Sequence, residues 1–165
     1  MRALGLVLGG VLCAGCAGLP VLPPRPDFAH DPGIRDSADK LATYYNWRVT
    51  PGDGGYHYGR FVIPLRQMPA FMDLQGDTVA ASWAREGNRV VVVGWLGALS
   101  LEAAAITVGA QGGAGDPVRN AWWMGLLPSA ILGWTFHWIG DNYFRKPAVA
   151  HYDLQLKREL ELTPD

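Results

Sequence analysis

Two long apolar segments, separated by a short glycine-rich stretch, constrain this chain more than any other feature of its sequence. Residues 90–110 contain one charged side chain, Glu102, and residues 121–140 contain no Asp, Glu, Lys or Arg. At about 1.5 Å of rise per residue, each segment makes a helix of roughly 30 Å, the thickness of the hydrocarbon core of a bilayer. The sequence therefore predicts a transmembrane helical hairpin over residues 90–140. The alternative is a buried hairpin in a soluble protein, but the remaining chain is too short to cover it.

The residues around the two segments fit a hairpin that crosses a membrane and returns. Gly-rich residues 111–115 form a predicted turn, after which Asp116 is a candidate N-cap and Pro117 suits the first helical position. Aromatic side chains, which are typical of the two membrane interfaces, gather at both ends of the second segment: Trp122, Trp123, Trp138, Tyr143 and Phe144.

Small residues recur at four-residue spacing in both segments. Gly94 and Ala98 are such a pair in the first segment, and Gly125, Ser129 and Gly133 repeat the spacing in the second. Helix backbones approach closely at small residues, and in lipid this packing replaces the missing hydrophobic drive between helices. The pattern predicts a packing face, used either within the hairpin or between copies of the chain.

Glu102 is the acidic residue of the two apolar segments. An ionisable side chain within a membrane is costly and by default marks a functional site. Counted from the ends of the hairpin, Ser129 lies level with Glu102, and the neighbouring Pro128 leaves a helix carbonyl without its usual donor. Burial without a cation favours the neutral carboxyl group. Two interpretations stay open: a contact between helices or copies, and a proton or ion pathway.

The N-terminus has the pattern of a secretory signal. Arg2 is followed by an apolar run at residues 3–12 and by small residues at 14 and 15, directly before Cys16. This small-small-Cys ending resembles the lipobox of bacterial lipoproteins, with Cys13 at the position where that class usually has a branched aliphatic residue. An ordinary cleaved signal and an uncleaved anchor are the alternatives.

The lipoprotein resemblance implies cleavage after residue 15, acylation of Cys16 and membrane anchoring in the bacterial envelope. Ala17 after the cysteine favours the outer membrane over the inner membrane in that class. The positive-inside rule gives the opposite orientation, with both termini in the cytoplasm, because four basic residues flank the hairpin: Arg85, Arg89, Arg145 and Lys146. The lipobox is the more specific signal, so we expect a hairpin that enters from the periplasm, where these basic residues meet anionic lipid.

The rest of the chain divides into a tether, a small periplasmic region and a tail. Residues 16–26 carry four prolines and predict an extended tether. Residues 27–89 are expected to begin with a helix that Asp36 and Ser37 cap and that runs to about Tyr45. A loop at 51–55 and a strand at 60–63 should follow. The last predicted element of this region is an amphipathic helix at 69–85, weakened by Gly76. Residues 141–165 predict an amphipathic helix with one apolar face: Val149, Tyr152, Leu156 and Leu160.

Motifs of catalysis and metal binding are absent from the sequence. There is no phosphate loop, paired-His zinc spacing or nucleophile elbow, and a net charge of -1 gives no basic footprint for nucleic acid. His57, between two tyrosines, is interpreted as part of a loop that stacks, with a hydrolase base as the alternative. We therefore expect no enzyme, cofactor or metal site.

These patterns together predict a mainly α-helical, lipid-anchored envelope protein. Its expected role is structural or in assembly, with membrane lipid as one partner and a homo-oligomer or larger envelope complex as the other. The alternative is a small transport or pore-forming subunit that uses Glu102.

Overall fold

The computed structural model describes residues 27–53, 55–111 and 116–162. As the sequence predicts, the chain is mainly α-helical, with one small sheet. The elements in chain order are η1 (Phe28–His30), α2 (Ser37–Trp47), β1 (Val49–Gly52), β2 (Gly55–Tyr58), β3 (Phe61–Ile63), η2 (Leu65–Gln67), α3 (Met68–Leu74), α4 (Thr78–Gln111), α5 (Asp116–Ile139), η3 (Gly140–Arg145) and α6 (Lys146–Glu159).

Several predictions fall outside the described residues. They are the signal at residues 1–15, the lipidated Cys16 with its tether at 16–26, and the turn glycines at 112–115. The side chains of Trp122 and Trp123 are also outside, although their backbone lies in α5.

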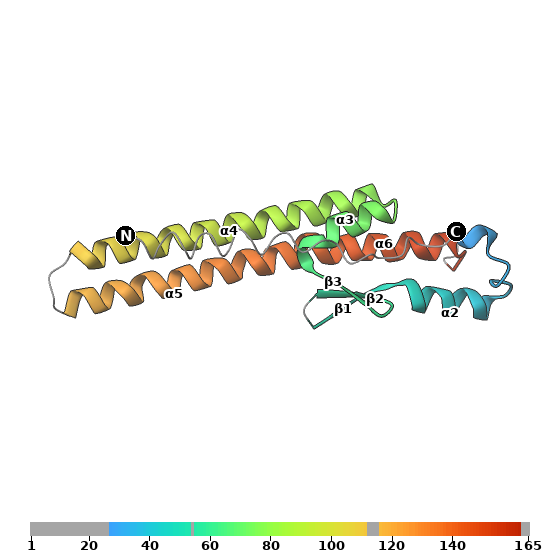
Figure 1. Cartoon of the computed structure of the whole chain (residues 1–165), viewed down its shortest axis with the longest axis horizontal. Coiled ribbons are helices and arrows are strands. Elements are labelled where there is room, and N and C mark those ends of the chain that lie inside the picture. Colours follow the sequence, from blue (N-terminus) through green and yellow to red (C-terminus); the bar gives the residue numbers. More distant parts are fainter. Residues whose placement is uncertain (1–26, 54, 112–115, 163–165) are drawn as a thin grey trace.

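A long antiparallel hairpin of α4 and α5 dominates the molecule (Figure 1). With 34 residues, α4 is roughly 51 Å long at about 1.5 Å per residue, and it begins at Thr78, well before the apolar segment. The π-helix η3 joins α5 to α6 in one continuous helical rod. Both ends of the predicted transmembrane segment, residues 90 and 140, therefore lie inside continuous helical structure.

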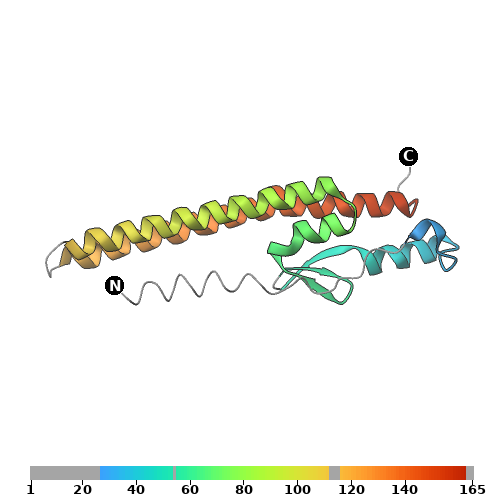
Figure 2. The same ribbon diagram turned by 45° about the horizontal axis from the view of Figure 1, so that its top comes forward.

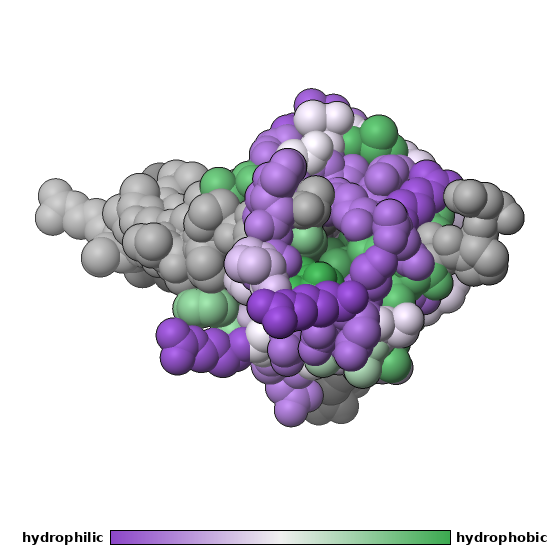
Figure 3. All heavy atoms as spheres, turned by 90° about the vertical axis from the view of Figure 1, so that its right-hand side faces the viewer, coloured by the Kyte–Doolittle hydropathy of each residue, from purple (hydrophilic) through white to green (hydrophobic). Residues whose placement is uncertain are grey.

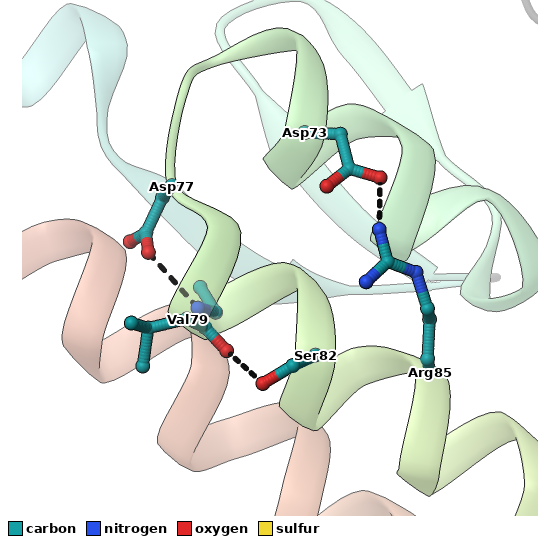
Figure 4. A network of polar contacts seen from close by, with 6 residues as sticks. Asp73, Asp77, Val79, Ser82 and Arg85 are labelled. Atoms are coloured by element: carbon teal, nitrogen blue, oxygen red, sulfur yellow. Dashed lines mark hydrogen bonds and ion pairs between the residues drawn. The ribbon is translucent and has the colours of Figure 1, made fainter.

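The predicted single helix at 69–85 is wrong, because the chain breaks at Gly76. Gly76 has φ +80°, a left-handed conformation that suits glycine. Its N–H donates to the carbonyl of Asp73, and the N–H of Asp77 donates to the carbonyl of Met72, each at 3.0 Å. This pair of bonds is a Schellman cap that ends α3. Asp77 then caps α4 by accepting from the N–H of Ala80 at 2.9 Å (Figure 4).

The predicted cap of α2 is confirmed. The Asp36 side chain accepts from the N–H of Asp39 at 2.8 Å, and the Asp39 side chain accepts in return from the N–H of Asp36. This reciprocal pattern is a capping box, here with aspartate in the third helical position. The helix ends at Trp47, two residues beyond the predicted end.

The small region contains three strands where the sequence predicted one. The predicted strand is β3, but the predicted loop at 51–55 belongs largely to β1 and β2, and the sheet order is β1-β2-β3 with antiparallel pairing. Pro51 is tolerated because β1 is an edge strand of this sheet. His57 lies in β2 and not in a loop, and its ring covers Gly52 so closely that a Cβ there would lie 2.1 Å from the ring.

The hydrophobic core lies where α6, α3, the start of α4 and the sheet meet (Figure 2). Aromatic rings connect these elements in sequence, with centroid distances of 5.2 Å for Trp47 and Tyr58, 4.8 Å for Tyr58 and Phe71, and 5.8 Å for Phe71 and Tyr152. The predicted apolar face of the tail helix is confirmed, since all four of its members are buried: Val149, Tyr152, Leu156 and Leu160.

Candidate functional site

The surface of the hairpin changes abruptly from charged to apolar along α4. Arg85, Glu86 and Arg89 are exposed, and beyond them Val92 and Val93 are 55% and 60% exposed. Large apolar side chains then remain exposed along both helices: Trp95, Leu96, Leu99, Leu101 and Ile106 on α4, and Leu127, Ile131, Trp134 and Trp138 on α5. Such a large exposed apolar surface marks a region that contacts a membrane or another protein.

The opposite end of the molecule has a different character. Figure 3 views it from the side away from the hairpin tip, where the described surface is largely hydrophilic. Within the described residues, one helix is long and apolar enough to cross a membrane, over residues 78–107 of α4. That α4 and α5 cross a membrane as a hairpin stays a prediction.

The small residues of the predicted packing face lie between α4 and α5. A Cβ on Gly94 would stand 2.1 Å from the Cβ of Phe136, and a Cβ on Gly125 would stand 2.1 Å from the Cβ of Ala105. Gly133 lies under the ring of Trp95, with 2.9 Å between its ideal Cβ and the nearest ring carbon. Ala98 and Ser129 are also buried. These contacts put the packing face within the hairpin, between α4 and α5.

A further close contact at the base of the hairpin escaped the sequence analysis. A Cβ on Gly87 would stand 2.9 Å from the carbonyl oxygen of Gly140, and a Cβ on Gly140 would stand 2.8 Å from that of Gly87. A signal for this contact is present in the sequence, because a helix face repeats after two turns, or about seven residues. Gly87 precedes Gly94 by seven residues, and Gly140 follows Gly133 by seven.

Glu102 lies beside the seam between the two helices, half-buried. Together with Ala105, Ile106 and Leu126 it lines a small notch of about 10 Å³, which is the lower limit of space for one water molecule. The hydroxyl of Ser129 donates to the carbonyl of Leu126 at 2.9 Å, inside its own helix. Among the described residues, Glu102 has no hydrogen-bond or ion-pair partner, so the level placement of Ser129 does not produce a bond between the two.

Aromatic side chains surround the hairpin near its base. The ring pairs Trp134 with His137 and Trp138 with Tyr143 have centroid distances of 6.4 and 5.8 Å. Trp134, Trp138 and Tyr143 are more than half exposed. Trp134 belongs to the exposed apolar surface, whereas Trp138 and Tyr143 lie where that surface ends, the place of an interfacial aromatic belt.

A polar cluster connects the base of the hairpin to the sheet. The hydroxyl of Tyr56 donates to Asp141 at 3.1 Å, and Arg145 donates through Nη2 to the Asn88 side chain at 2.9 Å. Asn88 in turn donates to the carbonyl of Arg66 at 3.2 Å. Burial, followed by the neighbouring Asp141 carboxylate, raises the pKa of the Tyr56 hydroxyl, whereas burial lowers the pKa of Arg145. The cluster fixes the small region to the helical rod at η3.

A second polar site joins α6 to the corner between α3 and α4. His151 Nδ1 lies 2.9 Å from the Asp77 carboxylate, and its ring meets the edge of Trp83 at 5.6 Å. His151 and Asp77 line an open pocket together with residues of the α3–α4 corner and of α6: Gln75, Gly76, Thr78, Val79, Gln155 and Glu159. Because Asp77 also caps α4, and an ion pair connects Arg85 to Asp73 (Figure 4), these polar groups position the corner.

Sequence reasoning missed both polar clusters because their members are distant in the chain. Asp77 and His151 are 74 residues apart, and Tyr56 and Asp141 are 85 apart. Within the described residues, no group of three or more His, Cys, Asp and Glu side chains is arranged to hold a metal ion. Comparison of the chain with protein-family models, curated proteins and solved structures gives no match in any of the three.

Proposed function

We propose that the chain is a lipid-anchored protein of the bacterial envelope that inserts the hairpin of α4 and α5 into a membrane. Its role is structural or in assembly, within a homo-oligomer or a larger envelope complex, and the outer membrane is favoured over the inner one. The lipid anchor is Cys16, and the small region with α6 lies on the periplasmic side.

One observation carries this proposal: the exposed surface of α4 changes from charged to apolar between Arg89 and Val92. Moving a large apolar side chain such as Val or Leu out of water lowers the free energy by on the order of 1.5–3 kcal/mol, and each side chain that stays exposed lacks this stabilisation. Hydrocarbon removes that cost, and the aromatic side chains at Trp138 and Tyr143 lie at the level where its boundary would run. The hydrophilic opposite end agrees with the same arrangement (Figure 3).

The lengths of the chain segments allow both anchors to use one membrane surface. The first described residues lie at the end of the molecule away from the hairpin tip (Figure 1). The 14 residues of α6 rise roughly 21 Å between that end and the base of the hairpin. Ten residues separate Cys16 from Asp27, and a chain of ten residues can span at most roughly 33–36 Å. The tether is thus long enough to return to the surface that the hairpin enters.

Mass spectrometry of the mature N-terminus, combined with membrane fractionation, tests the proposal. We expect a chain that begins with an acylated Cys16 and stays in the membrane pellet after extraction with alkaline carbonate. Cys16→Ser should abolish acylation, whereas Cys13→Ser is the matched control and should be processed normally. An intact Met1 would contradict both the lipid anchor and the periplasmic orientation.

A transport or pore-forming subunit is the second candidate, because Glu102 has no partner among the described residues. The notch around Glu102 is small and otherwise lined by apolar side chains, which favours the structural role. Proton flux into liposomes separates the two roles. A Glu102→Gln variant that assembles normally but loses flux would support transport, and equal flux for both proteins at the level of empty liposomes would support the structural role.

A further inference from the structure

Glu102 presents a hydrogen-bonding group at the outer edge of the hairpin. Glu102 lines the notch with Ala105, Ile106 and Leu126, and the hydroxyl of Ser129 already donates to the carbonyl of Leu126. Leu99 and Ile106, one turn before and after Glu102, are 58% and 48% exposed. Glu102 is therefore a half-buried residue between exposed apolar side chains, on a part of the helix surface that a neighbouring helix can reach.

The depth of Glu102 in the hairpin restricts what that neighbour can offer. Two copies inserted in the same direction place equal residues at equal depth, so Glu102 of one copy meets residues at the level of Leu126 of the other. The basic residue of the hairpin nearest to this depth, Arg119, is seven positions from Leu126 along α5, which is roughly 10 Å by helical rise. A second copy therefore brings no cation to Glu102, and the charged residue type that it brings to this depth is its own Glu102.

A protonated carboxyl group is complementary to itself, because its O–H donates and its carbonyl oxygen accepts. A twofold axis brings identical residues together, which is the geometry that such a pair needs. Resting on the proposed membrane insertion, we propose that two copies of the chain associate side by side in the membrane through reciprocal hydrogen bonds between their Glu102 carboxyl groups. Leu99, Ile106 and Leu126 surround the pair and exclude water from it.

Energy transfer between donor- and acceptor-labelled chains tests this association. The full-length acylated protein is reconstituted in liposomes and the transfer efficiency is followed as lipid is added. Glu102→Leu should weaken association by roughly tenfold, the scale of one or two interhelical hydrogen bonds in a membrane. Glu102→Gln should retain most of it, because an amide also donates and accepts.

Ser100→Leu is the matched control. It places the same side chain at an exposed position of α4 whose hydroxyl bonds within its own helix, to the carbonyl of Leu96, and it should leave association unchanged. Carbonate extraction of each reconstituted variant reports insertion separately. A wild-type chain that is extracted contradicts the proposed function itself. Two results overturn the Glu102 contact alone: a wild-type chain that is inserted but monomeric, and a Glu102→Leu variant that associates like wild type. The monomeric result would point to a different partner helix with a basic residue.

Discussion

Replacing Gly94 by alanine adds one methyl group where α4 and α5 leave no room for it. The new Cβ would stand 2.1 Å from the Cβ of Phe136, whereas ordinary contact begins at 3.4 Å. The backbone of α5 fixes the Cβ of Phe136, so no rotamer change relieves the overlap. The two helices must separate locally by about the difference, 1.3 Å.

The size of the effect follows from this separation. Overpacking a close contact costs roughly 1–3 kcal/mol, and a gap of about 1 Å forfeits up to half of the dispersion energy of the atoms beside it. Alanine also gains roughly 0.5–1 kcal/mol over glycine inside a helix, so a single variant gives a mixed result. Gly97→Ala removes this ambiguity, because its new Cβ would meet the far end of Leu132 at 3.4 Å, an ordinary contact.

Equilibrium unfolding in detergent micelles, followed by circular dichroism at a dilution where the chain is monomeric, measures the difference. We expect Gly94→Ala to be less stable than Gly97→Ala by roughly 1–3 kcal/mol, since the helix-propensity gain is common to both. Gly125→Ala should behave like Gly94→Ala, because it meets the Cβ of Ala105 at the same 2.1 Å. Equal stabilities for the Gly94 and Gly97 variants, within about 0.3 kcal/mol, would refute close packing within the hairpin.

Three further substitutions test the small region, each by thermal or denaturant unfolding. Leu156→Ala removes a fully buried side chain and should lower the free energy of unfolding by roughly 2–5 kcal/mol. Leu154→Ala, at a position that is 38% exposed, should lower it much less. Similar losses of stability in the two variants would contradict the placement of α6. Asp36→Ala removes the capping box of α2 and should cost about 1 kcal/mol, and an unchanged midpoint would argue against the cap. Burial raises the pKa of Asp153, so as the pH rises this carboxyl ionises in the unfolded state before it does so in the folded state. Asp153→Asn removes the charge but keeps an acceptor for the Val49 N–H. The variant should therefore be more stable than wild type above the ordinary aspartate pKa, and it should lose that advantage in acid. A constant difference across that pH range would contradict the burial of this carboxyl.

Local signals in the sequence were enough to predict the elements whose evidence is contained in a few neighbouring residues. Asp36 and Asp39 form the cap of α2 three residues apart, and the apolar face of α6 follows from helical spacing alone. The strand β2 was missed although Tyr56 and Tyr58 alternate with His57, because the glycines on either side resemble a loop and Pro51 weakens the signal for its partner β1.

The remaining features depend on contacts that no local pattern contains. Gly76 was recognised as weakening a helix, but its φ of +80° is set by the Schellman cap and by the return of α3 onto α4. The buried Arg145 and its partner Asn88 come together because the π-helix lies against the base of α4. The sequence predicted that Ser129 lies level with Glu102, but it could not show that the Ser129 hydroxyl bonds to a carbonyl of its own helix.

The position of the lipid boundary on α4 tests the central claim most directly. A spin label is attached through a single ketone-bearing residue, so that the native cysteines stay intact, at Glu86, Arg89, Val92, Leu96 or Leu99 in liposome-bound protein. Accessibility to oxygen and to a water-soluble nickel complex is then compared. Membrane insertion predicts that the nickel complex reaches Glu86 and Arg89, and that from Val92 onward oxygen dominates and rises toward Leu99. Equal access of the nickel complex to all five positions would contradict the account.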